Sequence, residues 1–267
     1  VAVALAVGLF IEQAPAARFS LAGQAGEILW QGFVAGMLLL VARAGCTLTF
    51  DPQQDMERLG LLGALWCYGR AEREAFSLPD CLGGPLSPGG QNPDLVVVQS
   101  ESFFDPRPLC SGIRRDVLAN FDQIKGEALH YGRLGVPAWG ANTVRSEFAF
   151  LSGVSEALLG VHRFNPYRRI LCGRVITLAG KLSEAGYRTV CVHPYPASFY
   201  DRDKVYPYLG FDAFVDIRQF SGAARFGPYV ADSEVTRKIQ ELLGASTQPL
   251  FVFVITMENH GPLHLER

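Results

Sequence analysis

The sequence predicts an α/β fold with a mostly parallel central sheet flanked by helices. Three short apolar runs rich in β-branched residues, 94–99, 187–193 and 249–256, have the composition of strands buried within a sheet. Stretches with helical spacing of apolar residues lie between them, and such alternation of strand and helix is typical of a parallel sheet. A chain of 267 residues is long enough for one large domain of this kind and a small appendage.

Residues 1–50 are expected to form a partial transmembrane region. Residues 1–11 are uninterrupted apolar sequence, and residues 27–43 form a second apolar segment with Trp30 near one end. The second segment is slightly short for a span, so a buried or interfacial helix is the alternative. The chain lacks an initial Met and stops directly after an NHGP motif, so we expect it to be truncated at both ends.

Residues 51–92 are expected to be a juxtamembrane helix and a linker. Residues 51–74 mix charged and apolar side chains, which is typical of an amphipathic helix on a membrane or domain surface. Residues 78–93 are dense in Pro and Gly, and such composition marks a domain boundary. The main domain is therefore expected at 93–267, with its C-terminal part missing.

Within 93–267, further elements are expected between and around the three strands. They are a helix at 114–125, a short strand at 132–136, a helix starting at Thr143, a helix at 174–185, an irregular aromatic-rich stretch at 194–216, and a helix at 232–243.

Charge and cysteine content exclude some functional classes. The net charge is −2 and there is no long basic run, so nucleic acid is not an expected partner. The six cysteines have no CxxC or Cys/His spacing, so neither a zinc site nor a redox pair is indicated. Most are expected to be buried small hydrophobes; pairing of Cys81 with Cys110 is an alternative in an oxidising compartment.

The stretch 135–153 is where we expect the chemistry. A turn of small residues delivers Thr143 to the start of a helix, where free backbone N–H groups and the helix dipole favour a bound phosphate. The alternative is that Thr143 is only an N-cap. A capping box needs Glu or Gln three residues later, but Ser146 occupies that position and the acid follows at Glu147.

Four other polar residues lie at predicted strand ends or in the aromatic stretch. Glu101 follows the first strand, His193 ends the second, His260 follows the third, and Arg202 lies between two aspartates. Each has a structural alternative: a solvated acid, a core or turn histidine, a turn histidine and local charge pairing, respectively. Ligands bind at the carboxyl ends of strands in open α/β sheets, so these residues are candidates for one site.

Together these residues suit phosphoryl transfer. A threonine hydroxyl is a weak nucleophile, and a bound divalent cation lowers its pKa. Glu101 offers a hard carboxylate ligand for such a cation, Arg202 offers a fork for a phosphate, and His260 offers a hydrogen-bond donor or proton carrier.

Four segments in order resemble a known family. DLVVVQSESFFD, GVPAWGANTVRSEFAFLSG, YRTVCVHPYPASFYDRDKVYPYLGFDAFVD and FVFVITMENHGP are similar to the extracytoplasmic domain of lipoteichoic acid synthases and related phosphoglycerol transferases. That family belongs to the alkaline phosphatase and sulfatase superfamily, and the resemblance covers residues 92–267. It implies that Glu101 and Thr143 are metal ligands, that Thr143 is also the nucleophile, and that the phosphoglycerol head group is bound by Arg202, His260, Tyr200 and His193.

The resemblance also implies the reaction. A membrane-anchored, metal-dependent transferase would move phosphoglycerol from phosphatidylglycerol to a glycan or polyglycerol-phosphate acceptor through a phospho-threonine intermediate, on the extracytoplasmic or periplasmic side of a bacterial inner membrane. Mn²⁺ is the favoured cation, with Mg²⁺ and Zn²⁺ as alternatives. The remaining metal ligands, an Asp-His pair, are expected beyond Arg267.

Three other functions remain open at this point. They are phosphoethanolamine transfer, phosphodiester hydrolysis, and non-catalytic binding of lipid or glycan. The formylglycine motif C/S-x-P-x-R of true sulfatases is absent from the sequence, which disfavours sulfate ester hydrolysis.

Overall fold

The computed structural model describes residues 26–36, 47–74, 77–86, 92–100, 102–137, 142–170 and 175–261. The chain divides into two compact units, residues 1–67 and 68–267. Residues 26–36 are helical. Among the described residues no helix combines the length and the apolar character that a membrane crossing requires. The candidate span at 1–11 and the second half of the one at 27–43 lie outside these residues.

The helix expected at 51–74 is present as α3 (Pro52–Ala71). Its first turn is capped by Asp51, whose carboxylate accepts the backbone N–H of Gln53 at 3.0 Å. Gly60 interrupts the helix with a left-handed φ of 69°, so the segment is two helices joined at a kink.

A four-stranded sheet organises the second unit. Its strands are β1 (Leu95–Gln99), β6 (Leu250–Ile255), β2 (Arg188–Val192) and β3 (Ala213–Val215), in the spatial order β1-β6-β2-β3. Every neighbouring pair is parallel. The predicted α/β class with a parallel sheet is therefore confirmed, and the carboxyl ends of β1, β2 and β6 share one edge.

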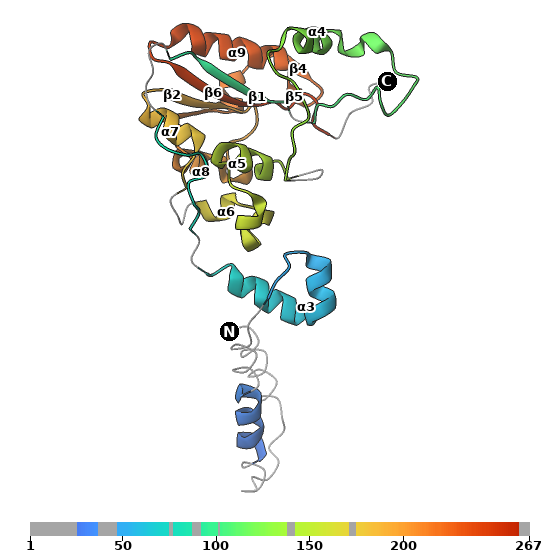
Figure 1. The fold of residues 1–267 in the computed structure, drawn as a ribbon, viewed down its shortest axis with the longest axis vertical. Coiled ribbons are helices and arrows are strands. Elements are labelled where there is room, and N and C mark those ends of the chain that lie inside the picture. Colours follow the sequence, from blue (N-terminus) through green and yellow to red (C-terminus); the bar gives the residue numbers. More distant parts are fainter. Residues whose placement is uncertain are drawn as a thin grey trace. The chain divides into compact units, whose positions relative to one another are not determined.

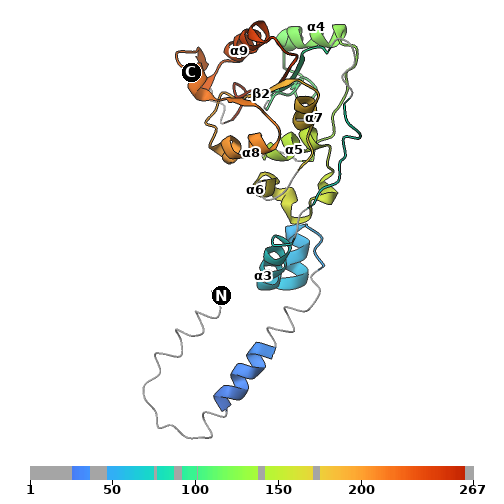
Figure 2. The same ribbon diagram turned by 90° about the vertical axis from the view of Figure 1, so that its left-hand side faces the viewer.

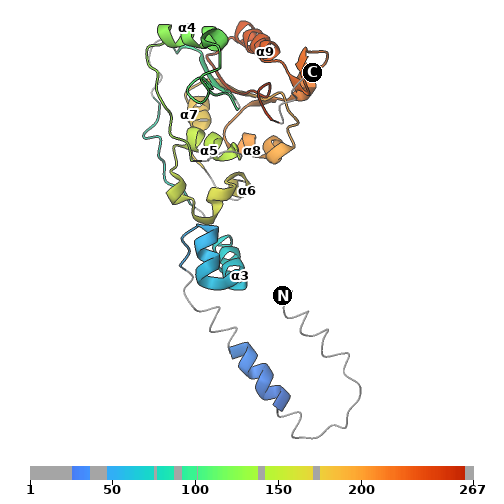
Figure 3. The ribbon, with the colours of Figure 1, turned by 90° about the vertical axis from the view of Figure 1, so that its right-hand side faces the viewer.

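Side chains of β6 alternate between the two faces of the sheet. Phe251, Phe253 and Ile255 join a core cluster with residues of α5 to α8, while Val252 and Val254 pack with α9. Figure 1 shows helices on both sides of the sheet, and the side views in Figures 2 and 3 place α9 on one side and α5, α7 and α8 on the other. The strand is fully buried because both faces are covered.

The helices of this unit are short. They are α4 (Ala119–Glu127), α5 (Val144–Ser152), α6 (Tyr167–Ile170), α7 (Leu178–Glu184), α8 (Arg202–Tyr208) and α9 (Asp232–Ala245), with 3₁₀ turns at Arg115–Leu118, Glu156–Leu158, Gly160–Phe164, Phe199–Asp201 and Ile217–Phe220. A two-stranded antiparallel hairpin, β4 (Arg225–Phe226) and β5 (Tyr229–Val230), completes the unit.

Some local predictions are wrong. Residues 132–136 are irregular rather than a strand, and the stretch 194–216 contains α8 and β3 rather than being irregular throughout. β1 was expected to be buried on both faces, but Val96 and Val98 on one face are exposed by 41% and 53% of their surface. A continuous apolar run predicts a strand, but it does not predict whether both faces of that strand are buried.

The cysteines also differ from expectation. Cys81 and Cys110 are both free and exposed, so the alternative pairing between them does not occur. Cys67 is disulfide-bonded, although no spacing in the sequence indicated a bridge. Cys191 is fully buried in β2, and burial raises the pKa of its thiol well above the usual value.

Candidate active site

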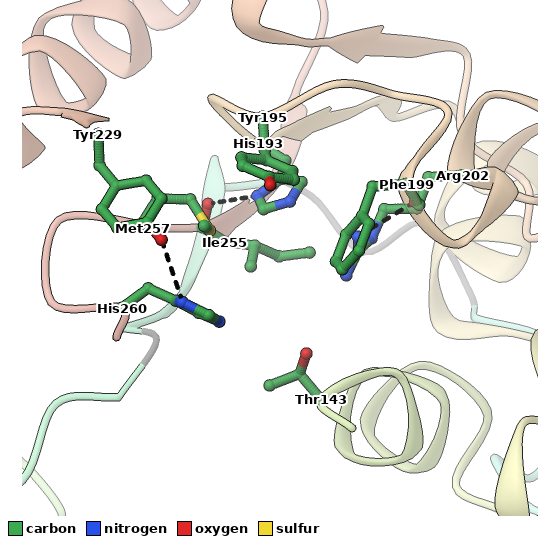
Figure 4. Close-up of a pocket in the computed structure, with 9 residues that line it drawn as sticks. All are labelled: Thr143, His193, Tyr195, Phe199, Arg202, Tyr229, Ile255, Met257 and His260. Atoms are coloured by element: carbon green, nitrogen blue, oxygen red, sulfur yellow. Dashed lines mark hydrogen bonds between the residues drawn. The ribbon is translucent and has the colours of Figure 1, made fainter. Parts of the chain in front are cut away.

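A small pocket, with a cavity volume of about 50 Å³, opens at the carboxyl ends of β2 and β6. It is lined by Thr143, His193, Tyr195, Phe199, Arg202, Tyr229, Ile255, Met257 and His260. In Figure 4 the hydroxyl of Thr143 and the ring of His260 point toward the same hollow, with His193 and Arg202 on its far side. Four residues proposed from sequence, far apart along the chain, therefore meet in one place. This is the sheet edge where parallel strands present ligands.

Thr143 occupies the N-cap position of α5, but its side chain does not cap the helix. Asn142 before it adopts a left-handed φ of 69°, and its side-chain amide donates to the carbonyl of Phe164 at 2.7 Å. Asn tolerates that conformation better than most residues. The alternative in which the Thr143 hydroxyl serves only as a cap is wrong, and the hydroxyl is left for the pocket.

Arg202 is nearly fully buried, with 1% of its surface exposed, yet it lines the pocket. Its guanidinium donates to the two carboxylate oxygens of Glu147, from Nη2 at 2.6 Å and from Nε at 3.3 Å. Nη1 donates to the carbonyl of Phe199 at 3.3 Å. Burial lowers the pKa of Arg202, but the charge and hydrogen bond of Glu147, together with the neighbouring Tyr206 and Tyr167, outweigh burial and raise it.

The alternative of charge pairing within Asp201-Arg202-Asp203 is not what the structure shows. The partner of Asp201 is Lys204, at 2.6 Å. Tyr200 and Asp201 both have left-handed φ values, 58° and 52°, immediately before Arg202. Such conformations are uncommon outside glycine and cluster at functional sites.

Glu147 is the residue that sequence reasoning missed. It is fully buried, and besides Arg202 it accepts hydrogen bonds from the hydroxyls of Tyr167 at 2.8 Å and Tyr206 at 3.0 Å. Burial and the neighbouring Glu147 charge raise the pKa of both tyrosines well above the usual value, so both remain protonated donors. A sequence signal existed, because Glu147 occupies an apolar position in the pattern Val144, Phe148, Leu151.

His193 lies at the end of β2 with 2% of its surface exposed. Its Nδ1 lies 3.0 Å from the carbonyl oxygen of Ile255. A carbonyl only accepts, so Nδ1 carries the proton and Nε2 is an acceptor. Burial, followed by the positive charge of Arg202, lowers the pKa of His193 to about 4. The imidazole is therefore neutral at physiological pH.

His260 lies in the loop after β6, and its backbone N–H donates to the carbonyl of Met257 at 2.9 Å. Its Nδ1 lies 2.6 Å from the carbonyl oxygen of Gly261 and 3.5 Å from the hydroxyl of Tyr229. The Tyr229 hydroxyl in turn donates to the carbonyl of Gly261 at 3.1 Å. These contacts orient the ring, which leaves Nε2 for the pocket (Figure 4).

One predicted site residue, Tyr200, does not line the pocket. Tyr200 is half-buried, and its ring lies 5.3 Å from Cζ of Arg202, where it supports the guanidinium. Glu101 lies outside the described residues. No group of three or more His, Cys, Asp or Glu side chains arranged to hold a metal ion occurs among the residues described. The lining of the pocket supplies the Thr143 hydroxyl but no carboxylate, so these residues alone do not form a metal centre.

Comparison with known proteins shows the family of this chain. The family described as Sulfatase matches residues 93–267. The chain belongs to the sulfatase family. Within it, the chain is similar to the capsular polysaccharide biosynthesis protein RkpI of Rhizobium meliloti (strain 1021), with 36% identity over 175 residues, covering 64% of this chain and 32% of RkpI.

Solved structures of the same sulfatase and alkaline phosphatase superfamily share the fold. The phosphoglycerol transferase GacH of Streptococcus pyogenes, in complex with sn-glycerol-1-phosphate, superposes with a TM-score of 0.53 at 25% identity, covering 64% of this chain and 46% of GacH. The lipoteichoic acid synthase LtaP of Listeria monocytogenes has a TM-score of 0.53 at 20% identity, covering 79% of this chain and 47% of LtaP. The resemblance to lipoteichoic acid synthase-like proteins is confirmed. The chain spans about a third of RkpI and about half of the two solved chains.

Proposed function

We propose that this chain is the phosphoglycerol transferase part of a membrane-anchored protein, and that Thr143 is its nucleophile. One observation carries the proposal: an uncapped threonine hydroxyl at a helix N-terminus opens into the same pocket as Arg202, His193 and His260. Helix N-terminal N–H groups, a guanidinium and imidazoles are the groups that bind phosphate esters. The similarity to GacH, a phosphoglycerol transferase, supports the choice of substrate.

In the proposed reaction the Thr143 oxygen attacks the phosphorus of phosphatidylglycerol. A bond forms between Thr143 Oγ and phosphorus, the bond from phosphorus to the diacylglycerol oxygen breaks, and diacylglycerol leaves with a proton as the free alcohol. An acceptor hydroxyl then attacks the phosphorus, takes the phosphoglycerol group, and Thr143 recovers its proton. Arg202 and His260 would hold the phosphoryl oxygens, and Nε2 of neutral His193 would accept a hydrogen bond from a substrate hydroxyl.

A divalent cation is part of the proposal, with Glu101 and Thr143 as its ligands in this chain. When bound, it would supply the lowered pKa of the Thr143 hydroxyl. Oxygen ligands favour Mn²⁺ or Mg²⁺ over softer ions. The ligand set itself stays a prediction, because Glu101 is outside the described residues.

A glycan is the acceptor we favour. RkpI is named as a capsular polysaccharide biosynthesis protein, which supports an acceptor in a cell-envelope polysaccharide. We place the domain on the extracytoplasmic side of a bacterial inner membrane, anchored by the apolar region at 1–50. Such an anchor would bring the pocket to the lipid donor.

The test uses the full-length protein, Mn²⁺ and phosphatidylglycerol labelled in its glycerol head group. We expect release of diacylglycerol and label on Thr143, and loss of both in Thr143→Ala. Thr236→Ala is the matched control, because Thr236 lies on α9 and its hydroxyl only donates to the carbonyl of Asp232. Equal diacylglycerol release by the wild-type protein and Thr143→Ala would remove the proposal. A parallel reaction with phosphatidylethanolamine separates the phosphoethanolamine alternative, and a reaction without acceptor separates hydrolysis from transfer.

A further inference from the structure

We infer that Glu147 is a positioning residue that sets the phosphate-binding edge of Arg202 and ties it to the helix that presents Thr143. The inference rests on the proposed function of this pocket and deepens it. It assigns a role to a buried carboxylate that touches neither the pocket nor a substrate.

The hydrogen bonds of Arg202 divide its guanidinium into two edges. Glu147 accepts from Nε and Nη2, which is the side edge of the group, and the Phe199 carbonyl accepts from Nη1. These bonds use three of the five N–H donors, so one N–H on Nη1 and one on Nη2 remain. Within the described part of the chain, no hydrogen-bond acceptor is found for these two donors. An oxyanion in the pocket would therefore meet donors of a planar guanidinium, a group that binds phosphate in a bidentate manner.

The carboxylate itself has little freedom. One oxygen of Glu147 accepts from Arg202 Nη2, and the other accepts from Arg202 Nε and from the hydroxyls of Tyr167 and Tyr206. The rings of these two tyrosines meet edge to face, 6.0 Å apart, and both are buried in the core. A charge buried without partners would be unstable, so this full set of donors fixes both the charge and its direction.

Glu147 also connects the guanidinium to the proposed nucleophile. It lies one helical turn after Thr143, and its backbone N–H donates to the Thr143 carbonyl at 2.9 Å. Helix α5 thus carries the hydroxyl at its start and the partner of Arg202 one turn later. The separation between the attacking oxygen and the phosphate-binding edge is set by a single rigid turn and one ion pair. Small errors in such a separation are costly for group transfer.

Aromatic rings hold the plane of the guanidinium. Cζ of Arg202 lies 5.8 Å from the Phe199 ring centre and 5.3 Å from that of Tyr200. These contacts resist tilting, while Glu147 resists rotation of the group within its plane. Removal of Glu147 would therefore leave Arg202 in the pocket but with its donors turned away from the phosphate.

The experiment is a double-mutant cycle on the full-length protein. The variants are Glu147→Gln, Arg202→Gln and the double variant, and the readout is binding of sn-glycerol 1-phosphate by calorimetry in the presence of Mn²⁺. We expect each single variant to weaken binding at least tenfold, and the double variant to bind no more weakly than Arg202→Gln alone. Glu147→Asp keeps the charge but shortens the reach, so it should retain the fold and still weaken binding.

One control variant and one further readout separate positioning from loss of fold. Lys181→Met breaks the ion pair that the buried Lys181 makes with Asp80 at 2.8 Å, outside the pocket, and should lower the melting temperature without changing glycerol phosphate affinity. The transfer reaction gives a second readout, in which we expect both Glu147→Gln and Arg202→Gln to raise KM and lower kcat.

The inference would be overturned if Glu147→Gln bound glycerol phosphate with wild-type affinity. It would also be overturned if the double variant bound tenfold more weakly than Arg202→Gln alone. So would a wild-type chain that does not bind glycerol phosphate. A wild-type chain that binds glycerol phosphate with the expected coupling, but releases no diacylglycerol from phosphatidylglycerol, would reject the proposed function and leave the positioning role standing.

Discussion

Replacing Gly210 with alanine tests how closely the turn after α8, the helix that carries Arg202, packs against α7. Gly210 ends the turn after α8 with a φ of +87°, and a Cβ there would lie 2.5 Å from Cα and 2.6 Å from N of Gly180 in α7. Both contacts are with backbone, which cannot move aside without shifting the helix. The Thr177 side chain already links these segments, because it accepts from the Gly180 N–H at 3.0 Å and donates to the Leu209 carbonyl.

Gly186 provides a matched control. Its φ of +90° is nearly the same, but a Cβ there would meet nothing within 4 Å. Gly186→Ala should therefore cost only the left-handed strain, about 1–2 kcal/mol. Gly210→Ala should cost this strain and, in addition, the overpacking penalty of about 1–3 kcal/mol.

The assay is urea unfolding of both variants and the wild-type protein, with the free energy of unfolding extrapolated to water. The difference between the free energies of unfolding of the two variants gives the overpacking penalty at Gly210. Equal losses of stability in Gly210→Ala and Gly186→Ala would refute the reasoning, because they would show that α7 and α8 do not approach as closely as described.

Three further predictions concern buried charge. The pKa of His193 in the folded state, about 4, lies below its unfolded value, about 6.5. The stability contributed by its neutral form is therefore present above about pH 6.5 and is lost as the pH falls toward 4. In urea unfolding, the wild-type protein should lose about 2 kcal/mol of stability between pH 7.5 and 5 relative to His193→Asn. Burial and the charge of Glu258 raise the pKa of Asp232 to about 6, so its stabilising contribution is lost as the pH rises through 6. The melting temperature of Asp232→Asn should therefore exceed that of the wild-type protein at pH 8. The difference between the two melting temperatures should be smaller at pH 5. Replacing Glu147 or Arg202 alone by methionine should lower the free energy of unfolding in chemical denaturation by about 3–5 kcal/mol, because each single variant leaves an unpaired buried charge. The double replacement leaves no such charge and should restore most of the lost stability.

The central sheet was accessible from sequence because its strands are encoded locally. The runs at 94–99, 187–193 and 249–256 are β-branched, short and bounded by turn residues, and each became a strand of the parallel sheet. Parallel strands must share an edge, so the prediction that His193 and His260 lie together followed from topology alone, and both line the pocket. Thr143 reached the same pocket by a different local signal, the turn before α5.

The contacts that hold Arg202 were not accessible in the same way. Its partner Glu147 lies 55 positions earlier in the chain, and no local spacing indicates that pair. The helix that carries Arg202 was also hidden, because α8 includes Pro207 and lies in a stretch of aromatic residues without a helical pattern. Tertiary packing, in which Val205 and Tyr206 are buried against the sheet, selects the helix despite its weak propensity.

Backbone strain shows why Arg202 points inward rather than toward its neighbouring aspartates. Tyr200 and Asp201 both adopt left-handed conformations, at a cost of about 1–2 kcal/mol each. The local sequence alone would favour pairing of Arg202 with Asp201 and Asp203, which needs neither conformation. The hydrogen bonds to buried Glu147 and to the Phe199 carbonyl offset that strain only when the chain turns in this way. The strained conformation of this segment lowers stability but places the guanidinium at the edge of the pocket, which is expected if that guanidinium binds substrate.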